Sequence, residues 1–339
     1  MIRASTARRL VTGAAYGGGG VGLAGAAFVA LLHEEARAAR RRVDARRQPD
    51  PPSGDGVYGR RRGTPISFTV LGDSSAVGLG VDRADQTPGV LIASALAELA
   101  ERPVRLTRLA VSGAKSPQLD AQVDAALLEH PDIALIMIGA NDVTSRTRPA
   151  ISVRHLGDAV RRLTAAGAEV VVGTCPDLGT IRPIGQPLRT LARRWSRQMA
   201  AAQTIAVVEA GGRTVSLGSA LGPSFATDLT LFSRDQFHPS AAGYAHAAAV
   251  LLPSVADALG VWPAAADRRR GTIRRDTVRP VATAAARAAS RTGSEVQPAE
   301  VPGPGAEPWG GWALLRRRRP PEITAAELAA PAQQESATT

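Results

Sequence analysis

The chain has 339 residues and a net charge of +11, with 44% hydrophobic but only 4% aromatic residues. This length allows one large domain or two small ones. The single cysteine, Cys175, excludes an intramolecular disulfide and a zinc site built from several thiolates. Lys115 is the only lysine, so arginine carries the positive charge. A preference for arginine over lysine can arise from mutational bias, so the positive charge alone does not indicate a nucleic-acid partner, and we expect none. We also expect no metal and no cofactor.

The N-terminus has the pattern of a membrane anchor. Residues 1–9 are basic, and the stretch from Leu10 to Leu32 contains no charged residue. It exceeds the roughly 20 apolar residues that a spanning helix needs, although Gly17–Gly20 interrupt it. We predict a single-pass anchor at 10–32, with a flexible glycine-rich leader as the alternative. Arginines flank both ends, so the side of the membrane stays open, as do secretion and a cytoplasmic location.

Composition divides the rest of the chain into three parts. Residues 33–65 are rich in Arg, Pro and Gly, which predicts a linker. Residues 66–262 alternate between apolar runs and amphipathic segments. Beyond them, 263–339 are rich in Ala, Pro, Arg and Glu, and this composition predicts a disordered tail.

The central part has the pattern of an α/β domain. Buried strands are predicted at Ile66–Leu71, Val104–Ala110, Ile133–Ile138, Glu169–Gly173 and Thr214–Leu217. Helices are predicted at about Pro88–Glu101, Pro117–Glu129, Ser152–Ala166, within Pro187–Ala210, and at Ser240–Leu259. Strands that alternate with helices in this way predict a three-layer α/β/α sandwich around a five-stranded parallel sheet. Ligands of such sheets bind at the carboxyl ends of the strands.

Short polar motifs stand where these predicted strands end and where the last helix begins. They are Gly72-Asp73-Ser74, Val111-Ser112-Gly113-Ala114, Ile138-Gly139-Ala140-Asn141-Asp142 and Asp235-Gln236-Phe237-His238. Each motif alone is typical of an ordinary turn. Together they supply a hydroxyl, an Asp-x-x-His pair, a carboxamide and exposed backbone N–H groups. Acyl transfer by a serine needs that inventory, namely a nucleophile, a base, a group that orients the base, and donors for an oxyanion.

In order and spacing, the four motifs resemble the sequence blocks of the SGNH/GDSL hydrolases, a family of serine esterases and lipases. The resemblance covers about Ile66 to Leu259 and implies a flavodoxin-like fold. It implies that Ser74 is the nucleophile, His238 the general base and Asp235 the group that orients the imidazole. The oxyanion hole would consist of the N–H groups of Ser74 and Gly113 and the side chain of Asn141.

Three other residues in or near the predicted site are weaker candidates for a catalytic role. Ser75 stands where the family often has Leu, so it offers a rival hydroxyl. Asp73 is expected to stabilise the turn, and Cys175 to pack near the pocket, rather than to react.

The sequence therefore predicts an ester hydrolase that works through an acyl-enzyme on Ser74, with a small-molecule, lipid or glycan acyl ester as substrate. Acyl transfer to another alcohol and thioester hydrolysis would use the same residues. A catalytically silent, membrane-tethered protein that binds acyl or glycan groups is the alternative of another class. The natural substrate and the oligomeric state stay open.

Overall fold

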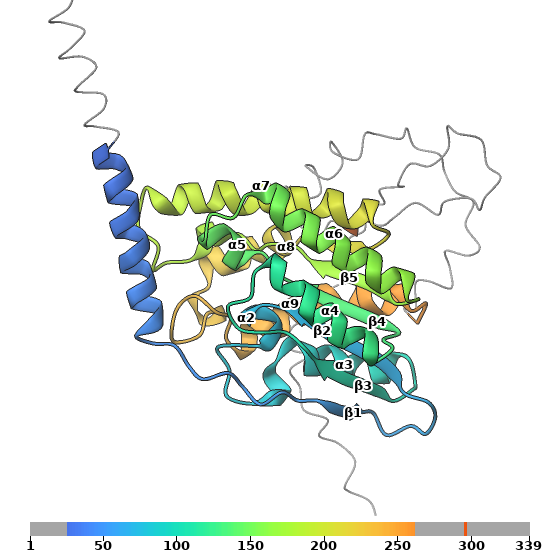
Figure 1. Ribbon diagram of the computed structural model, residues 1–339. Helices are drawn as coiled ribbons and strands as arrows, with labels where there is room; N and C mark the ends of the chain where they lie inside the picture. The colour runs from blue at the N-terminus through green and yellow to red at the C-terminus, as the bar shows by residue number, and fades with distance from the viewer. Residues whose placement is uncertain (1–25, 262–294, 297–339) are drawn as a thin grey trace, which may run out of the picture.

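The computed structural model of the chain describes residues 26–261 and 295–296 (Figure 1). Within these residues, one sheet has the strand order β1-β3-β2-β4-β5-β6-β7. Its five central strands are parallel and correspond to the five predicted ones, which confirms the parallel sheet. They are β2 (Ile66–Gly72), β3 (Val104–Arg108), β4 (Ile133–Met137), β5 (Glu169–Gly173) and β6 (Arg213–Val215).

The two edge strands were not predicted, and both run antiparallel to their neighbours. β1 (Gly56–Tyr58) lies in the stretch expected to be a linker and pairs with β3. β7 (Glu295–Val296) lies in the stretch expected to be a disordered tail and pairs with β6. The predicted five-stranded sheet is thus the centre of a mixed, seven-stranded one.

The central strands form because both of their faces are covered. All five residues of β4 are buried, as a continuous apolar run predicts. Successive side chains of a strand point to opposite faces. Accordingly, Ile133, Leu135 and Met137 belong to one core cluster, while Ala134 and Ile136 belong to the other.

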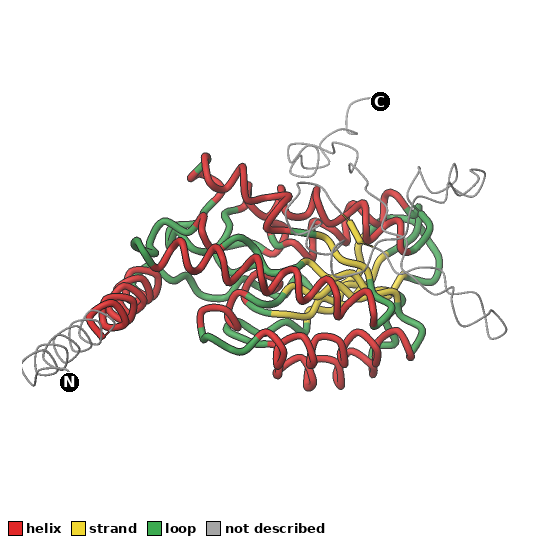
Figure 2. Tube along the Cα trace, turned by 90° about the horizontal axis from the view of Figure 1, so that it is seen from above, coloured by secondary structure: helices red, strands yellow, loops and turns green. Residues whose placement is uncertain are grey.

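Helices cover the two faces and complete the three layers that the sequence predicts (Figure 2). α3 (Pro88–Leu99) packs against α9 (Ala241–Ala258) on one face. α4 (Leu119–Leu128), α6 (Pro149–Ala165) and α7 (Leu188–Glu209) pack together on the other. Three further helices were not predicted: α2 (Ser74–Val77), α5 (Ala140–Thr144) and α8 (Leu217–Thr227). α8 begins at the residue where the last strand was expected to end.

The N-terminal region differs from the prediction. Residues 26–44 form a helix, so the first part of the expected linker is helical. Of the predicted anchor, 10–25 lie outside the described residues. No helix among the described residues is both long and apolar enough to cross a membrane. The predicted tail, 263–339, also lies outside the described residues except for 295–296.

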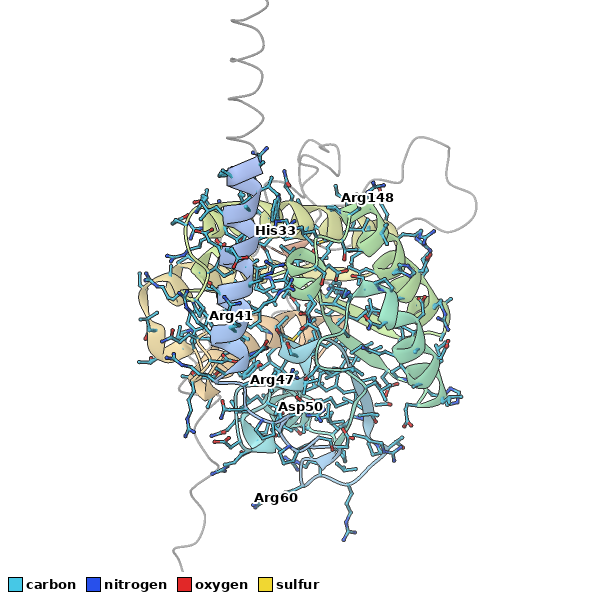
Figure 3. The ribbon with its side chains drawn as sticks, turned by 60° about the vertical axis from the view of Figure 1, so that its left-hand side comes forward. His33, Arg41, Arg47, Asp50, Arg60 and Arg148 are labelled. Atoms are coloured by element: carbon cyan, nitrogen blue, oxygen red, sulfur yellow. The ribbon has the colours of Figure 1, made fainter. Side chains whose placement is uncertain are left out.

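The helix at 26–44 lies beside the end of the domain that holds α2 and α5 (blue, Figure 1). When that side is turned forward, the helix runs down the front of the molecule, with His33 and Arg41 along it (Figure 3). α2 and α5 follow directly after β2 and β4 in the chain, so this side is the carboxyl edge of the sheet.

Candidate active site

The turn after β2 places Ser74 at the carboxyl edge of the sheet. Gly72 has a φ of +133°, and a Cβ on it would collide with the carbonyl oxygen of Met137, so only glycine fits. Asp73 follows as the N-cap of α2, and its side chain accepts a hydrogen bond of 2.9 Å from the Ser75 N–H. Ser74 is then the first residue of α2. Its N–H has no partner within the helix, because the first N–H groups of any helix lack one.

A buried glutamine of α4 holds this turn in place. The Oε1 atom of Gln122 accepts a bond of 2.7 Å from the Gly72 N–H, and its Nε2 donates one of 2.9 Å to the Gly72 carbonyl. Both bonds are buried and therefore fix the backbone directly before the nucleophile turn. Sequence reasoning missed this residue, because the contact joins positions far apart in the chain.

The turn before α9 brings Asp235 and His238 to Ser74. The Asp235 Oδ2 atom lies 2.6 Å from Nδ1 of His238, and Nε2 of the same ring lies 3.0 Å from the Ser74 Oγ. All three residues are buried, Asp235 being only 2% exposed. The structure thus joins the three predicted residues in one continuous hydrogen-bonded chain.

The second oxygen of Asp235 organises the turn itself. Oδ1 accepts hydrogen bonds from Ser233 Oγ and from the N–H groups of Phe237 and His238, at 2.8–2.9 Å. Burial of Asp235 acts to raise its pKa, but hydrogen bonds from His238 and Phe237 and the charge of His238 outweigh it. The pKa of Asp235 therefore lies below its usual value, and the carboxylate stays ionised.

The two other predicted residues lie on adjacent loops. Gly113 has a φ of +84° and is exposed, and Asn141 is the second residue of α5. The Asn141 Nδ2 donates a hydrogen bond of 3.1 Å to the carbonyl of Ala114, the residue after Gly113. The loops that carry the two predicted oxyanion donors are therefore in direct contact.

A buried carboxylate next to Asn141 ties these loops more firmly. The side chain of Asp142 is fully buried and accepts hydrogen bonds from the Ser116 N–H, the Ser116 hydroxyl and, at 2.8 Å, the Ser152 hydroxyl. Asp142 thus joins α5 to the loop after β3 and to α6. The predicted motif included this residue, but only its position beside Asn141 hinted at such a role.

An apolar pocket opens beside the imidazole. His238 lines it together with Asp73, Ser75 and apolar residues from the ends of β4 and β5, from α8 and from the segment before α7. The apolar residues include Met137, Ile138, Leu178, Ile181, Leu217, Leu221 and Phe225. Burial raises the pKa of Asp73 to about 6, against the lowering effect of its bond from Ser75 and of the charge on His238. Asp73 holds the turn, as predicted.

Cys175 sits near this pocket, as expected, and is packed. It is 1% exposed. Burial, followed by the negative charges of Asp73, Asp142 and Asp177, raises the pKa of its thiol well above the usual value. The thiolate, which is the reactive form, is therefore strongly disfavoured.

Residues 70–246 match the GDSL-like Lipase/Acylhydrolase family. The chain belongs to this family. The match includes all four motifs, and membership makes the chain an enzyme of the class that hydrolyses ester bonds.

One relative agrees with this assignment, and two solved structures are similar to the chain. A GDSL-like esterase of Mycobacterium tuberculosis is 47% identical over 222 residues, which cover 62% of this chain and 71% of that protein. Among solved structures, TesA is 23% identical with a TM-score of 0.45, covering 57% of this chain and 97% of its own. A putative SGNH hydrolase from Slackia heliotrinireducens is 25% identical with a TM-score of 0.42, covering 56% and 98%.

Proposed function

We propose that this GDSL-family protein hydrolyses a carboxylic ester through an acyl-enzyme on Ser74. The observation that carries the proposal is the chain of hydrogen bonds from Asp235 through His238 to the Ser74 hydroxyl. A serine hydroxyl is a poor nucleophile at neutral pH and needs a base within hydrogen-bond reach. Here the base is in reach, and a carboxylate orients it.

In the first step, Asp235 holds the imidazole with its proton on Nδ1, which leaves the lone pair of Nε2 facing the serine. Nε2 takes the hydroxyl proton as the Ser74 Oγ bonds to the ester carbonyl carbon. The carbonyl oxygen becomes an oxyanion. The N–H groups of Ser74 and Gly113 and the side-chain amide of Asn141 would stabilise it. An amide nitrogen carries two hydrogens, so the bond from Asn141 to Ala114 leaves one for the oxyanion.

In the second step, the bond between the carbonyl carbon and the leaving oxygen breaks. His238 gives its proton to that oxygen, which departs as an alcohol. Water then repeats the sequence: Nε2 takes a proton from it, its oxygen attacks the acyl carbon, and the Ser74 Oγ leaves with the proton. The products are a carboxylic acid and the free enzyme. If an alcohol replaced water, the same residues would transfer the acyl group to it.

The pocket beside His238 favours a substrate whose acyl group is apolar and binds in this pocket. Its walls are mainly apolar and include His238, and we expect a chain attached to the reacting carbonyl to extend into it. Burying apolar surface stabilises the complex by about 25 cal/mol per Å².

The test is labelling with a fluorophosphonate, together with turnover of p-nitrophenyl acetate. Wild-type protein should react with the probe and release p-nitrophenol, and Ser74→Ala should do neither. Ser75→Ala is the matched control, because it removes the neighbouring hydroxyl, and it should keep both activities. A folded wild-type protein that neither reacts nor turns over would refute the proposal in favour of a silent binding domain. Loss in Ser75→Ala alone would move the nucleophile by one residue.

A further inference from the structure

The helix at 26–44 lies outside the family match, yet it packs against the catalytic domain. Ala39 is buried in the core cluster, and Leu32 and Ala36 pack against the same cluster. Glu34 and Arg37 face solvent, where they form an exposed ion pair. The helix thus has one face on the domain and one in water.

Polar side chains of this helix bind two segments at the carboxyl edge of the sheet. The Arg40 guanidinium donates a hydrogen bond of 3.1 Å to the carbonyl of Thr144, the last residue of α5. Arg42 donates one of 3.1 Å to the carbonyl of Pro183, and Glu35 Oε2 accepts one of 2.9 Å from the Leu188 N–H. The last two bonds grip the segment 181–188, which leads into α7.

Glu35 supplies the acceptor for the first N–H group of α7, that of Leu188, while the next two, of Arg189 and Thr190, donate to the carbonyls of Gly185 and Pro187. The first N–H groups of a helix need acceptors, which usually come from a capping side chain or an acidic residue in the first turn. The N-cap of α7 is Pro187, which has no such acceptor, and its first turn contains no acidic residue. The carboxylate of Glu35 takes this place from a helix more than 150 residues away, and its charge also favours the positive end of α7.

The segment that Glu35 holds continues into a wall of the apolar pocket. Leu178, Thr180 and Ile181 line the pocket, and Ile184 and Leu188 are buried in the core beyond it. Gly185 lies so close to the Glu35 carboxylate that a Cβ on it would be 3.2 Å from Oε1. The pocket wall is therefore anchored at one end by a residue that is not part of the family match.

We propose that Glu35 is a positioning residue for substrate selection. By capping α7, it fixes segment 181–188 and with it the pocket wall that contacts the acyl chain. This inference rests on the proposed function. Hydrolysis of an ester whose acyl chain reaches the pocket wall should depend on Glu35. Hydrolysis of an acetyl ester, which is too short to fill the pocket, should not.

The experiment compares full-length wild type, Glu35→Ala and Glu35→Gln on p-nitrophenyl acetate and p-nitrophenyl hexanoate. Glu34→Ala is the matched control, because Glu34 is the preceding residue of the same helix and bonds only the exposed Arg37 in the structure described here. We expect Glu35→Ala to lower the ratio of kcat/KM for hexanoate over acetate roughly threefold to tenfold, which corresponds to about 0.7–1.4 kcal/mol in activation free energy. Glu35→Gln keeps an acceptor oxygen and should restore most of the ratio.

Hydrogen exchange followed by mass spectrometry gives the second readout, which does not depend on activity. The amides of 181–188 should exchange faster in Glu35→Ala than in wild type. In Glu34→Ala they should exchange at the wild-type rate. An unchanged ratio, or an equal fall for both esters, with a wild type that does turn over, would overturn the inference while leaving the proposed function intact. An inactive wild type would refute the proposed function. Unchanged exchange at 181–188 in Glu35→Ala would overturn the capping contact, whether or not the wild type is active.

Discussion

Replacing Asp235 by Asn should abolish catalysis without disturbing the turn that holds it. Three donors converge on Oδ1: the Ser233 hydroxyl and the N–H groups of Phe237 and His238. In the variant these donors keep the amide oxygen at that position, so the NH₂ group replaces Oδ2 and faces Nδ1 of His238. Nδ1 must then accept a hydrogen bond, and the ring proton moves to Nε2. The imidazole then has no lone pair for the Ser74 proton.

The expected loss in kcat is on the order of 10⁴, which corresponds to about 5 kcal/mol of transition-state stabilisation. Because the three bonds to the turn persist, Tm should change by only a few degrees. The assay is p-nitrophenyl acetate turnover, with thermal unfolding followed by circular dichroism on the same samples.

Asp228→Asn is the matched control for this prediction. Asp228 caps a short turn by accepting bonds from the N–H and hydroxyl of Thr230, and no hydrogen bond links it to His238 in the described structure. Its replacement should leave kcat within a factor of two. A loss below about thirtyfold in a folded Asp235→Asn protein would refute the tautomer argument, and a larger loss in Asp228→Asn would show that any change in this loop is harmful.

Three further predictions follow from buried groups near the site. Tyr244→Phe removes the hydrogen bond of 2.8 Å to the buried Leu79 carbonyl and should lower the free energy of unfolding by about 1–3 kcal/mol, measured by urea denaturation. The thiol of Cys175 should resist iodoacetamide at pH 8 in the native protein and react only after unfolding; because it is the only cysteine, intact mass reports it directly, and native labelling would contradict its burial. Asp73 has a pKa raised from 3.8 to about 6, so the folded protein keeps a proton that the unfolded chain releases in this range, and stability should fall as the pH rises from about 4 to 6. Asp73→Asn should therefore raise Tm at pH 8 and match wild type near pH 4; a variant less stable than wild type at pH 8 would contradict the pKa.

The sequence predicted the centre of the fold well because that part has strong local signals. β4 is a continuous apolar run buried on both faces, and β2 is mostly apolar and buried, with Ser67 and Thr69 as its polar residues. β1 has only three residues, two of them exposed, so it is too short to show an alternating or continuous apolar pattern. α8 contains Pro223 and two glycines, which are typical of loops, and it is helical because its apolar residues pack beside the pocket.

The helical first part of the expected linker, residues 33–44, was missed for a different reason. Its many arginines suggested a linker, although Ala, Glu and Arg are good helix formers. What stabilises the helix on the domain is a set of contacts to residues more than 100 positions away, such as Glu35 with Leu188. Composition contains no information on contacts of this kind.

The same distinction applies to the site. The proximity of Ser74, Asp235 and His238 could be predicted from the resemblance of their motifs to the SGNH/GDSL blocks, together with the rule that ligands bind at the carboxyl edge of a parallel sheet. Gln122 and Asp142 could not be assigned their roles, since these depend on hydrogen bonds that only the packed structure brings about.

The proposed mechanism requires an acyl group on Ser74, and capturing that group tests the mechanism. Protein mixed with p-nitrophenyl acetate, quenched in acid within the first turnovers and digested, should yield a peptide that carries one acetyl group on Ser74. Fragmentation distinguishes Ser74 from Ser75, and Ser74→Ala should give no acetylated peptide. Acetylation on Ser75, or steady turnover by Ser74→Ala, would contradict an acyl-enzyme on Ser74.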